Sequence, residues 1–528
     1  MKVYPKGIFL TLIHLVVMSN LSWGCAESEN RPGDESNPKD TVLVIDTSIK
    51  YQTIRSFGAS DAWTVQYIGL WPDSKRNQVA DWLFSTETDA LGQPKGIGLS
   101  LWRFNIGAGS AGQNNISDDW RATETFLNKN GTYDWTKQAG QQWLLHAAKE
   151  RGVNQFLAFT NSPPVSLTRN GNAFSSQNNQ ANIDPKNYLA FANFLTEVSE
   201  HFRKEKGITF NYLSPFNEPQ WDWTGTGQEG TPFTNQEIYN VVKKLDSLIS
   251  NKQLPYKILV GEAGKLNYLY EEADKPSRGN QIYDFFNAGS PRYLGSFSSV
   301  EKAISGHSYF TSAPANYMVA VRNTLTNKIK EASSPIEFWQ SEYCILGDQE
   351  EIPGGGKDLG INTALYVARV MHNDLVVANA SAWHWWLAVS AYDYKDGLIY
   401  MDKNKTDGNV EASKLMWAVG NFSRFIRPGA VRVNTTGENI SINDPSGLMV
   451  SSYLNTESKK LITVIINYGL TDITTEIEVK GHTVTDFYPF VTSAGSDENM
   501  KPHPSIKPGT KVSIPKRSIV TLTGSITL

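Results

Sequence analysis

Residues 184–204 read DPKNYLAFANFLTEVSEHFRK, and residues 212–216 read YLSPF. The large apolar residues of the first segment recur at spacings of three and four, so they fall on one face of an α-helix. They are Tyr188, Phe191, Leu195, Val198 and Phe202. The second segment is a short apolar run, which is typical of a strand buried on both faces. Together the two segments predict one helix followed by one strand of a parallel sheet.

The same alternation continues from about Ser56 to Phe425, where eight short apolar runs and eight amphipathic stretches can be distinguished. Buried strands that alternate with helices indicate a parallel sheet covered on both faces. Eight such units in about 370 residues predict an α/β fold, a (β/α)8 TIM barrel with long loops. The predicted strands are Ser56–Ala59, Gly98–Arg103, Gln155–Thr160, Tyr212–Phe216, Lys257–Gly261, Ala303–His307, Ile336–Ser341 and Ala380–Trp385.

The periodicity changes after Arg427-Pro428-Gly429, where alternating or β-branched runs are bounded by Asn, Asp, Gly and Pro. This pattern predicts an antiparallel β-sandwich over residues 428–528. Thr41–Ile54 has the same character, so we expect residues 41–55 to add a strand to the sandwich and residues 56–427 to form the barrel. The predicted sandwich strands are Leu448–Tyr453, Lys460–Asn467, Thr474–Val479, Thr483–Phe487 and Ser518–Gly524.

Residues 1–24 have the features of a signal peptide. Two lysines precede the apolar stretch Gly7–Met18, which is too short to span a bilayer. The following Leu21-Ser22-Trp23-Gly24-Cys25 resembles a bacterial lipobox, although Trp23 and Ser22 replace the small residue and the leucine usual there. The polar residues 25–40 resemble the tether of Bacteroidetes surface lipoproteins. We expect an exported protein anchored by lipid on Cys25 at the cell surface or in the periplasm; a plain signal peptide cut elsewhere is the alternative.

Composition and motifs narrow the choice of partners. The formal net charge of -4 and the lack of a long basic run argue against a nucleic-acid partner. The chain has no His-Glu-x-x-His, no paired Cys-x-x-Cys and no Gly-rich loop ending in Lys-Ser or Lys-Thr. We therefore expect neither a metal nor another cofactor, and contact with a membrane only through the lipid anchor.

Two glutamates stand at the ends of predicted strands, in Phe216-Asn217-Glu218 and in Ser341-Glu342. The active sites of such barrels form at the carboxyl ends of the strands, so both side chains are expected at the same rim. One carboxyl group of such a pair can protonate the leaving oxygen of a glycosidic bond while the other attacks the anomeric carbon. The pair predicts a glycosidase acting on a polysaccharide or oligosaccharide.

The other predicted strands also end in polar or aromatic residues, which are candidate sugar contacts. They are Asp61, Arg103, Asn161, Glu262, His307, Tyr309 and Trp385, with Trp221 just after Glu218. Several of these assignments have alternatives from the residues alone. Arg103 could form a structural salt bridge, Glu262 could be structural or could contact a sugar hydroxyl, and His307 could be a packing residue. Trp221 and Trp223 could be stacking platforms for further sugar units or loop anchors. Trp385 and Trp386 point to opposite faces of a strand, so only one of them would line the site.

Several stretches resemble those of a known family. The Asn-Glu-Pro and Ser-Glu elements, with Arg103 and His307-Ser308-Tyr309, are similar to the clan A retaining glycosidases. Leu83-Phe84-Ser85, residues 96–107 (GIGLSLWRFNIG) and residues 417–429 (WAVGNFSRFIRPG) resemble glycoside hydrolase family 30, and within it the endo-β-1,6-galactanases. The likeness runs from about Thr41 to the C-terminus.

This resemblance implies a role for each matched residue. Glu218 would be the acid/base and Glu342 the nucleophile, with Arg103 and Tyr309 hydrogen-bonded to Glu342. Asn217 would hold the 2-hydroxyl of the sugar, and His307 and Trp385 would line the subsite. Two charges ~5 Å apart at an effective dielectric of about 20 repel by ~3 kcal/mol, roughly two pKa units. Arg103 beside Glu342 would then leave Glu218 as the protonated member of the pair.

The favoured function is a retaining endo-glycosidase that acts on β-1,6-linked galactan. Three alternatives keep the mechanism and change the sugar: β-1,6-glucan, other β-glucosides and glucuronoxylan. The xylanases of the family use an arginine in the loop after strand 8, and this chain has no arginine between Ala380 and Asn421. A glycan-binding lipoprotein without activity is the alternative from another class, although a binder would gain nothing from two buried carboxylates.

Overall fold

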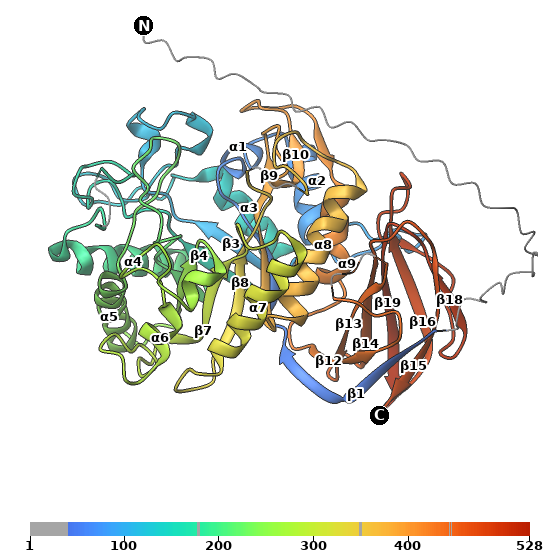
Figure 1. The fold of residues 1–528 in the computed structure, drawn as a ribbon. Coiled ribbons are helices and arrows are strands. Elements are labelled where there is room, and N and C mark those ends of the chain that lie inside the picture. The colour runs from blue at the N-terminus through green and yellow to red at the C-terminus, as the bar shows by residue number, and fades with distance from the viewer. Residues whose placement is uncertain (1–40, 177–179, 348–350, 443, 445, 528) are drawn as a thin grey trace, which may run out of the picture. The chain divides into compact units, whose positions relative to one another are not determined.

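The computed structural model describes residues 41–176, 180–347, 351–442, 444 and 446–527. Eight parallel strands form a closed barrel in the order β9-β2-β3-β4-β5-β6-β7-β8, and pairing of β8 with β9 completes the circle. The predicted (β/α)8 barrel is therefore confirmed (Figure 1). Its strands are β2 (Ser56–Ser60), β3 (Leu101–Asn105), β4 (Gln155–Phe159), β5 (Tyr212–Ser214), β6 (Lys257–Ala263), β7 (Val300–His307), β8 (Glu337–Glu342) and β9 (Ala380–Ser390).

Helices follow every barrel strand and surround the barrel (Figure 1). The α-helices are α1 (Val65–Ile68), α2 (Asp73–Phe84), α3 (Ala139–Glu150), α4 (Tyr188–Glu205), α5 (Asn235–Asn251), α6 (Gln281–Phe286), α7 (Ala315–Ile329), α8 (Ile361–Val376) and α9 (Lys414–Ser423). Short 3-10 helices are η1 (Ser110–Gly112), η2 (Asp119–Arg121), η3 (Pro185–Asn187) and η4 (Leu266–Leu269). Two further strands, β10 (Gly397–Met401) and β11 (Val410–Ala412), extend the sheet beside β9.

Each of the eight predicted barrel strands differs from the observed strand in at least one bound, and two of these differences have identifiable reasons. Gly98 has a φ of 58°, a left-handed conformation that excludes it from a strand, so β3 begins at Leu101. β5 ends at Ser214 because Pro215 has no N–H to donate to a sheet. The predicted helix over residues 184–204 begins with η3, which has Pro185 in its first turn, and continues as α4.

The second domain is a β-sandwich formed by one nine-stranded sheet, in the order β17-β16-β19-β14-β13-β12-β1-β15-β18. All pairings are antiparallel except that of β1 with β15, which is parallel. The strands are β1 (Thr41–Thr53), β12 (Val431–Thr436), β13 (Leu448–Asn455), β14 (Lys460–Asn467), β15 (Ile473–Lys480), β16 (Thr483–Thr492), β17 (Lys501–Pro502), β18 (Lys511–Ile514) and β19 (Ser518–Thr527).

The nine-stranded sheet curls around a core of its own. Ile45 of β1, Ile465 of β14 and Phe487 of β16 belong to one apolar cluster, although β1 and β16 are far apart in the strand order. Figure 1 shows β1, in blue, beside the orange and red strands of the C-terminal part. The N-terminal strand thus completes a sheet whose other members come from the last hundred residues.

A polar contact joins the sheet to the barrel domain. The Asn421 side chain, on α9, donates to Thr521 Oγ1 at 2.9 Å and accepts from Thr492 Oγ1 at 2.5 Å. All three residues are buried. Because a buried amide without partners costs about 1–3 kcal/mol, this contact fixes how α9 lies on the sheet.

No helix within the described residues is long and apolar enough to cross a membrane. Cys25 and the predicted signal peptide lie outside the described residues, so lipid attachment at Cys25 stays a prediction.

Candidate active site

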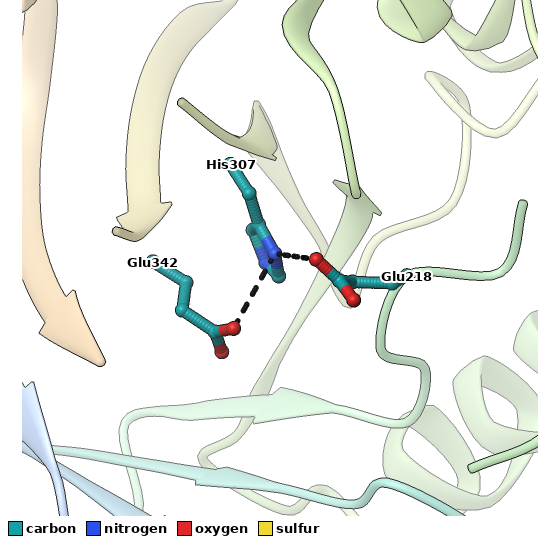
Figure 2. Close-up of side chains that lie close together, drawn as sticks. All are labelled: Glu218, His307 and Glu342. Atoms are coloured by element: carbon teal, nitrogen blue, oxygen red, sulfur yellow. Dashed lines mark hydrogen bonds and ion pairs between the residues drawn. The ribbon is translucent and has the colours of Figure 1, made fainter. Parts of the chain in front are cut away.

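Glu218 and Glu342 lie at one rim of the barrel. Glu342 is the last residue of β8, and Glu218 follows the end of β5 by four residues. Because these strands are parallel, their carboxyl ends open onto the same side. One carboxylate oxygen of each glutamate and one ring nitrogen of His307 lie within 4.8 Å of one another. Figure 2 shows the His307 ring between the two glutamates.

Glu342 is held by two donors. Tyr309 Oη donates to Oε1 at 3.0 Å, and the Arg103 guanidinium forms a short ion pair with Oε2. Arg103 also donates to Asn217 Oδ1 at 3.2 Å, which leaves Asn217 Nδ2 without an acceptor in the described part of the chain. The side chain of Glu342 is only 4% exposed. This carboxylate is therefore fixed in orientation and matched with a permanent cation.

Glu218 has a different environment. Its Oε1 lies 3.0 Å from His307 Nδ1, and no described residue is hydrogen-bonded to its Oε2. The side chain is 10% exposed, so Oε2 is the free oxygen of the pair that can reach a bound sugar. Burial raises the pKa of Glu218, and the charge of Glu342 raises it further, whereas His307 and Arg103 lower it. The net direction is upward, as a proton donor requires.

The remaining charged groups form a buried network beneath this pair. Glu262, at the carboxyl end of β6, accepts from His307 Nε2 at 2.9 Å and from Arg103 Nη2 at 3.4 Å. Burial opposes its charge, but Arg103 and His307 hold the pKa of Glu262 at about 2. Burial likewise opposes charge on His307, but Glu342, Glu218 and Glu262 raise its pKa to about 10. The network thus pairs Arg103 and His307 with the carboxylates around them, while the pKa of Glu218 is shifted upward by burial.

The spacing of Glu218, His307 and Glu342 would also suit a metal ion. A histidine binds metal through a free lone pair on one nitrogen. Both nitrogens of His307 instead face carboxylate oxygens, and the pKa of about 10 keeps both protonated near neutral pH. These residues fit a charge network better than a metal centre.

A cavity of about 300 Å³ opens above the two glutamates. Its lining residues include Asn217, Glu218, Tyr309 and Glu342 with an aromatic wall of Trp63, Trp221, Trp223, Phe310 and Trp386. Four of the lining residues, Trp63, Glu218, Trp223 and Phe310, have φ between 43° and 58°, a left-handed conformation that is strained for residues other than glycine. Such strain costs of order 1–3 kcal/mol per residue and tends to gather at functional sites.

Trp386, and not Trp385, lines the cavity. Trp385 was the expected subsite residue, but it is fully buried, and its Nε1 donates to the Asp396 carbonyl at 2.7 Å. Its ring packs against Trp383 at a centroid distance of 6.1 Å. Trp386 instead meets Trp63 edge to face at 5.3 Å. The alternation of the strand thus places the neighbouring indole at the cavity.

A matched pair of variants tests this placement. Trp386→Ala is expected to lower kcat/KM by about 10- to 100-fold, because an apolar surface that covers the sugar is lost. Trp385→Ala is expected to lower the free energy of unfolding by about 3–5 kcal/mol through the cavity that it leaves. Urea unfolding and steady-state kinetics of both variants provide the comparison. A larger loss of kcat/KM in Trp385→Ala, measured on folded protein, would contradict the assignment.

The other expected contact residues have varied positions. Trp221 lines the cavity. His307 was expected to line the subsite. It is instead fully buried beneath the cavity, where it contacts the glutamates. Asp61 is also fully buried, and its Oδ1 accepts from the Asn105 N–H at 2.7 Å, which ties the loop after β2 to β3. Asn161 is 5% exposed and has no partner at Oδ1 among the described residues.

Two aromatic residues that line the cavity, Trp63 and Phe310, were not predicted as contacts. Both stand just after a strand end, but nothing in their residue type indicates a left-handed backbone. Trp223, which the sequence left open between a sugar contact and a loop anchor, lines the cavity. Glu262 was left open between two roles, and its full burial makes it part of the network beneath the cavity.

Comparisons with known proteins agree with this geometry. The family model for O-Glycosyl hydrolase family 30 matches residues 40–400. An endo-β-1,6-galactanase from Hypocrea rufa is 25% identical over 456 residues, 81% of this chain and 82% of the relative. A conserved exported protein from Bacteroides fragilis superposes with a TM-score of 0.86 at 36% identity, over 91% of this chain and 100% of that chain. The catalytic domain of xylanase C from Talaromyces cellulolyticus shares the fold, with a TM-score of 0.66 at 23% identity over 92% and 100% of the two chains.

Proposed function

Because the chain belongs to O-glycosyl hydrolase family 30 and is a glycoside hydrolase, we propose that it is a retaining endo-glycosidase that cleaves β-1,6-linked galactan. The observation that carries the retaining mechanism is the short distance between the two carboxylates: one oxygen of Glu218 lies within 4.8 Å of one oxygen of Glu342. Retaining enzymes hold the two groups about 5–5.5 Å apart, whereas inverting enzymes leave room for a water between them. The galactan preference rests on the likeness to the galactanase from Hypocrea rufa.

In the first step, Glu342 attacks the anomeric carbon while Glu218 gives its proton to the glycosidic oxygen. The bond between that carbon and that oxygen breaks, and the glycosyl group becomes an ester of Glu342. Asn217 Nδ2, which has no acceptor among the described residues, is available for the 2-hydroxyl of the sugar. Trp63 and Trp386 supply the apolar surface on which the ring rests.

In the second step, Glu218 must act as a base. Esterification removes the charge of Glu342, so the cations of Arg103 and His307 then face only the anion of Glu262. This excess of positive charge lowers the pKa of Glu218 and favours its ionised form. Glu218 takes a proton from water, the water oxygen bonds to the anomeric carbon, and the ester breaks to restore Glu342.

Action within a chain is supported by the residues that line the cavity. Trp221, Trp223 and Phe310 line it in addition to the residues around the reacting carbon. They would hold further sugar units of a polysaccharide.

We also propose that the enzyme is exported and carries lipid on Cys25. The test is to label the full chain and its Cys25→Ser variant with a tagged fatty acid. Label on the Cys25→Ser variant, or none on the unaltered chain, would contradict acylation there.

The test of the proposed function is a panel of β-1,6-galactan, β-1,6-glucan and glucuronoxylan, with the released products identified. We expect galactan oligosaccharides, and the first product seen by proton NMR should be the β-anomer. If oligosaccharides are released only from glucan or only from xylan, the proposed mechanism stands but the proposed substrate is wrong. An α-anomer as first product would contradict retention, and products from no substrate would favour a binding protein.

A further inference from the structure

Glu262 is a buried carboxylate that forms no bond and transfers no proton in the two-step mechanism. It lies at the carboxyl end of β6, is fully buried, and has a left-handed φ of 48°. Its Oε1 accepts from Ser214 Oγ at 3.0 Å, and its Oε2 accepts from Ser341 Oγ at 2.8 Å. Its backbone N–H is bound to Ser305 Oγ at 3.0 Å, and its carbonyl accepts from the Glu218 N–H at 2.9 Å. A residue fixed in this way cannot reach a sugar hydroxyl.

The contact that matters for chemistry is the one with His307. Its Nε2 lies 2.9 Å from Glu262 Oε2, and its Nδ1 lies 3.0 Å from Glu218 Oε1. When both nitrogens carry hydrogen, Nδ1 donates and Glu218 Oε1 can only accept. The acidic proton of Glu218 then has to reside on Oε2, the oxygen that no described residue binds.

We propose that Glu262 is a positioning residue for the acid/base: it keeps His307 protonated on both nitrogens and thereby assigns the transferable proton of Glu218 to Oε2. The proposal rests on the proposed function, because it gives Glu218 the acid/base role. Without the anion at position 262, His307 would hold its charge less tightly. A neutral ring with hydrogen on Nε2 has a lone pair on Nδ1, and that lone pair would accept the proton of Glu218 in place of the leaving group.

The charged groups around Glu262 and His307 are consistent with a protonated His307. His307 faces the carboxylates of Glu218, Glu262 and Glu342 and the ring of Tyr309, at a centroid distance of 5.6 Å. Glu262 faces Arg103 as well as His307, and its charge also acts on His384. Burial lowers the pKa of His384 to about 3, so that ring brings no second cation. Arg103 already pairs with Glu342, which leaves Glu262 as the main counter-charge on the Nε2 side of His307.

The decisive variant is Glu262→Gln, which keeps the size of the side chain and removes its charge. Its activity is followed from pH 5 to pH 9 on a natural oligosaccharide and on a dinitrophenyl glycoside, whose leaving group needs no proton. With the oligosaccharide, kcat is expected to fall about 10- to 100-fold near neutral pH, less than the roughly 10²- to 10⁴-fold that complete loss of a general acid would cost, because Glu218 itself is retained. It should recover toward acid pH, because His307 is charged below its lowered pKa and loses that charge as the pH rises through it.

With the dinitrophenyl glycoside, formation of the glycosyl-enzyme in Glu262→Gln should stay within about threefold of the unaltered enzyme. Glu229→Gln is the matched control, since Glu229 is also buried and hydrogen-bonded, to Ser110 and the Ala108 N–H. It should cost stability without changing the pH profile. Equal losses on both substrates with an unchanged pH profile would show that Glu262 is only structural and would overturn the proposal.

A second readout does not depend on activity. The chain has eight histidines, and protein labelled with ¹⁵N at histidine gives imidazole signals that report protonation. The His307 signal is identified by its absence in His307→Asn. In the unaltered protein it should remain that of an imidazolium until the pH approaches about 10. In Glu262→Gln it should titrate below neutral pH, over the same range in which kcat of that variant recovers.

The two readouts separate the possible failures. If the unaltered protein releases products from no glycan, the proposed function fails, while the histidine titration still decides whether Glu262 holds the charge of His307. An imidazolium signal that persists unchanged in Glu262→Gln would overturn the inference even if the enzyme is a galactanase.

Discussion

Glu342→Ala is expected to abolish turnover, with kcat lower by about four orders of magnitude or more. The variant removes the carboxylate that we propose as the nucleophile, and it leaves Arg103 buried beside an empty space. At 1.36 kcal/mol per factor of ten, the expected loss corresponds to about 5 kcal/mol of transition-state stabilisation. Steady-state kinetics with an activated aryl β-glycoside are the measurement, since this substrate is the least demanding.

Sodium azide provides the stereochemical check on Glu342→Ala. Azide can enter the space left by the carboxylate and attack in a single displacement, which should yield an α-glycosyl azide from a β-glycoside. Glu337→Ala is the control on the same strand, because Glu337 lies at the opposite end of β8 and pairs with Arg55. Turnover by Glu342→Ala within tenfold of the unaltered enzyme would remove Glu342 from the mechanism.

Glu218→Ala is expected to separate substrates by their leaving groups. On a natural oligosaccharide, the loss of the proton donor should lower kcat/KM by about 10²- to 10⁴-fold. A dinitrophenolate needs no protonation, so the first step on a dinitrophenyl glycoside should be nearly unaffected. The ester would then persist, because the base that activates water is also missing. Stopped-flow kinetics should therefore show a burst followed by slow release.

Azide should give the opposite stereochemistry with this second variant. It would attack the ester on Glu342 from the face where Glu218 stood, and two displacements yield a β-glycosyl azide. Equal losses on both substrates, without a burst, would mean that Glu218 binds or positions the substrate and does not transfer the proton.

The barrel was predictable because each of its strands contains a short, mainly apolar run bounded by polar loops. Both sides of a parallel strand are buried, so these runs stand out from the amphipathic helices between them. The errors have local causes. Gly98 adopts a left-handed conformation and delays β3 to Leu101, and Pro215 shortens β5. The backbone conformation of a single residue cannot be predicted from the local pattern of apolar and polar residues.

The candidate site was predictable in its members and less so in its arrangement. Strand-end position identified Glu218 and Glu342, and it also brought in Arg103, His307 and Glu262. The choice between Trp385 and Trp386 could not be made, because all residues of β9 are buried and its two faces look alike in sequence. The contacts of His307 depend on the register between β5, β6, β7 and β8, which no local pattern encodes.

The parallel pairing of β1 with β15 has a consequence for biosynthesis. Thr47 of β1 bonds to Lys480 of β15 across 433 positions of the chain. At a synthesis rate of 5–20 residues per second, β1 waits about 20 to 90 s on the ribosome before this neighbour exists. During that interval the apolar residues of β1 are not packed against their native partners, so we expect chaperones to bind the emerging chain. For the same reason, a barrel expressed without the C-terminal hundred residues should be prone to aggregate.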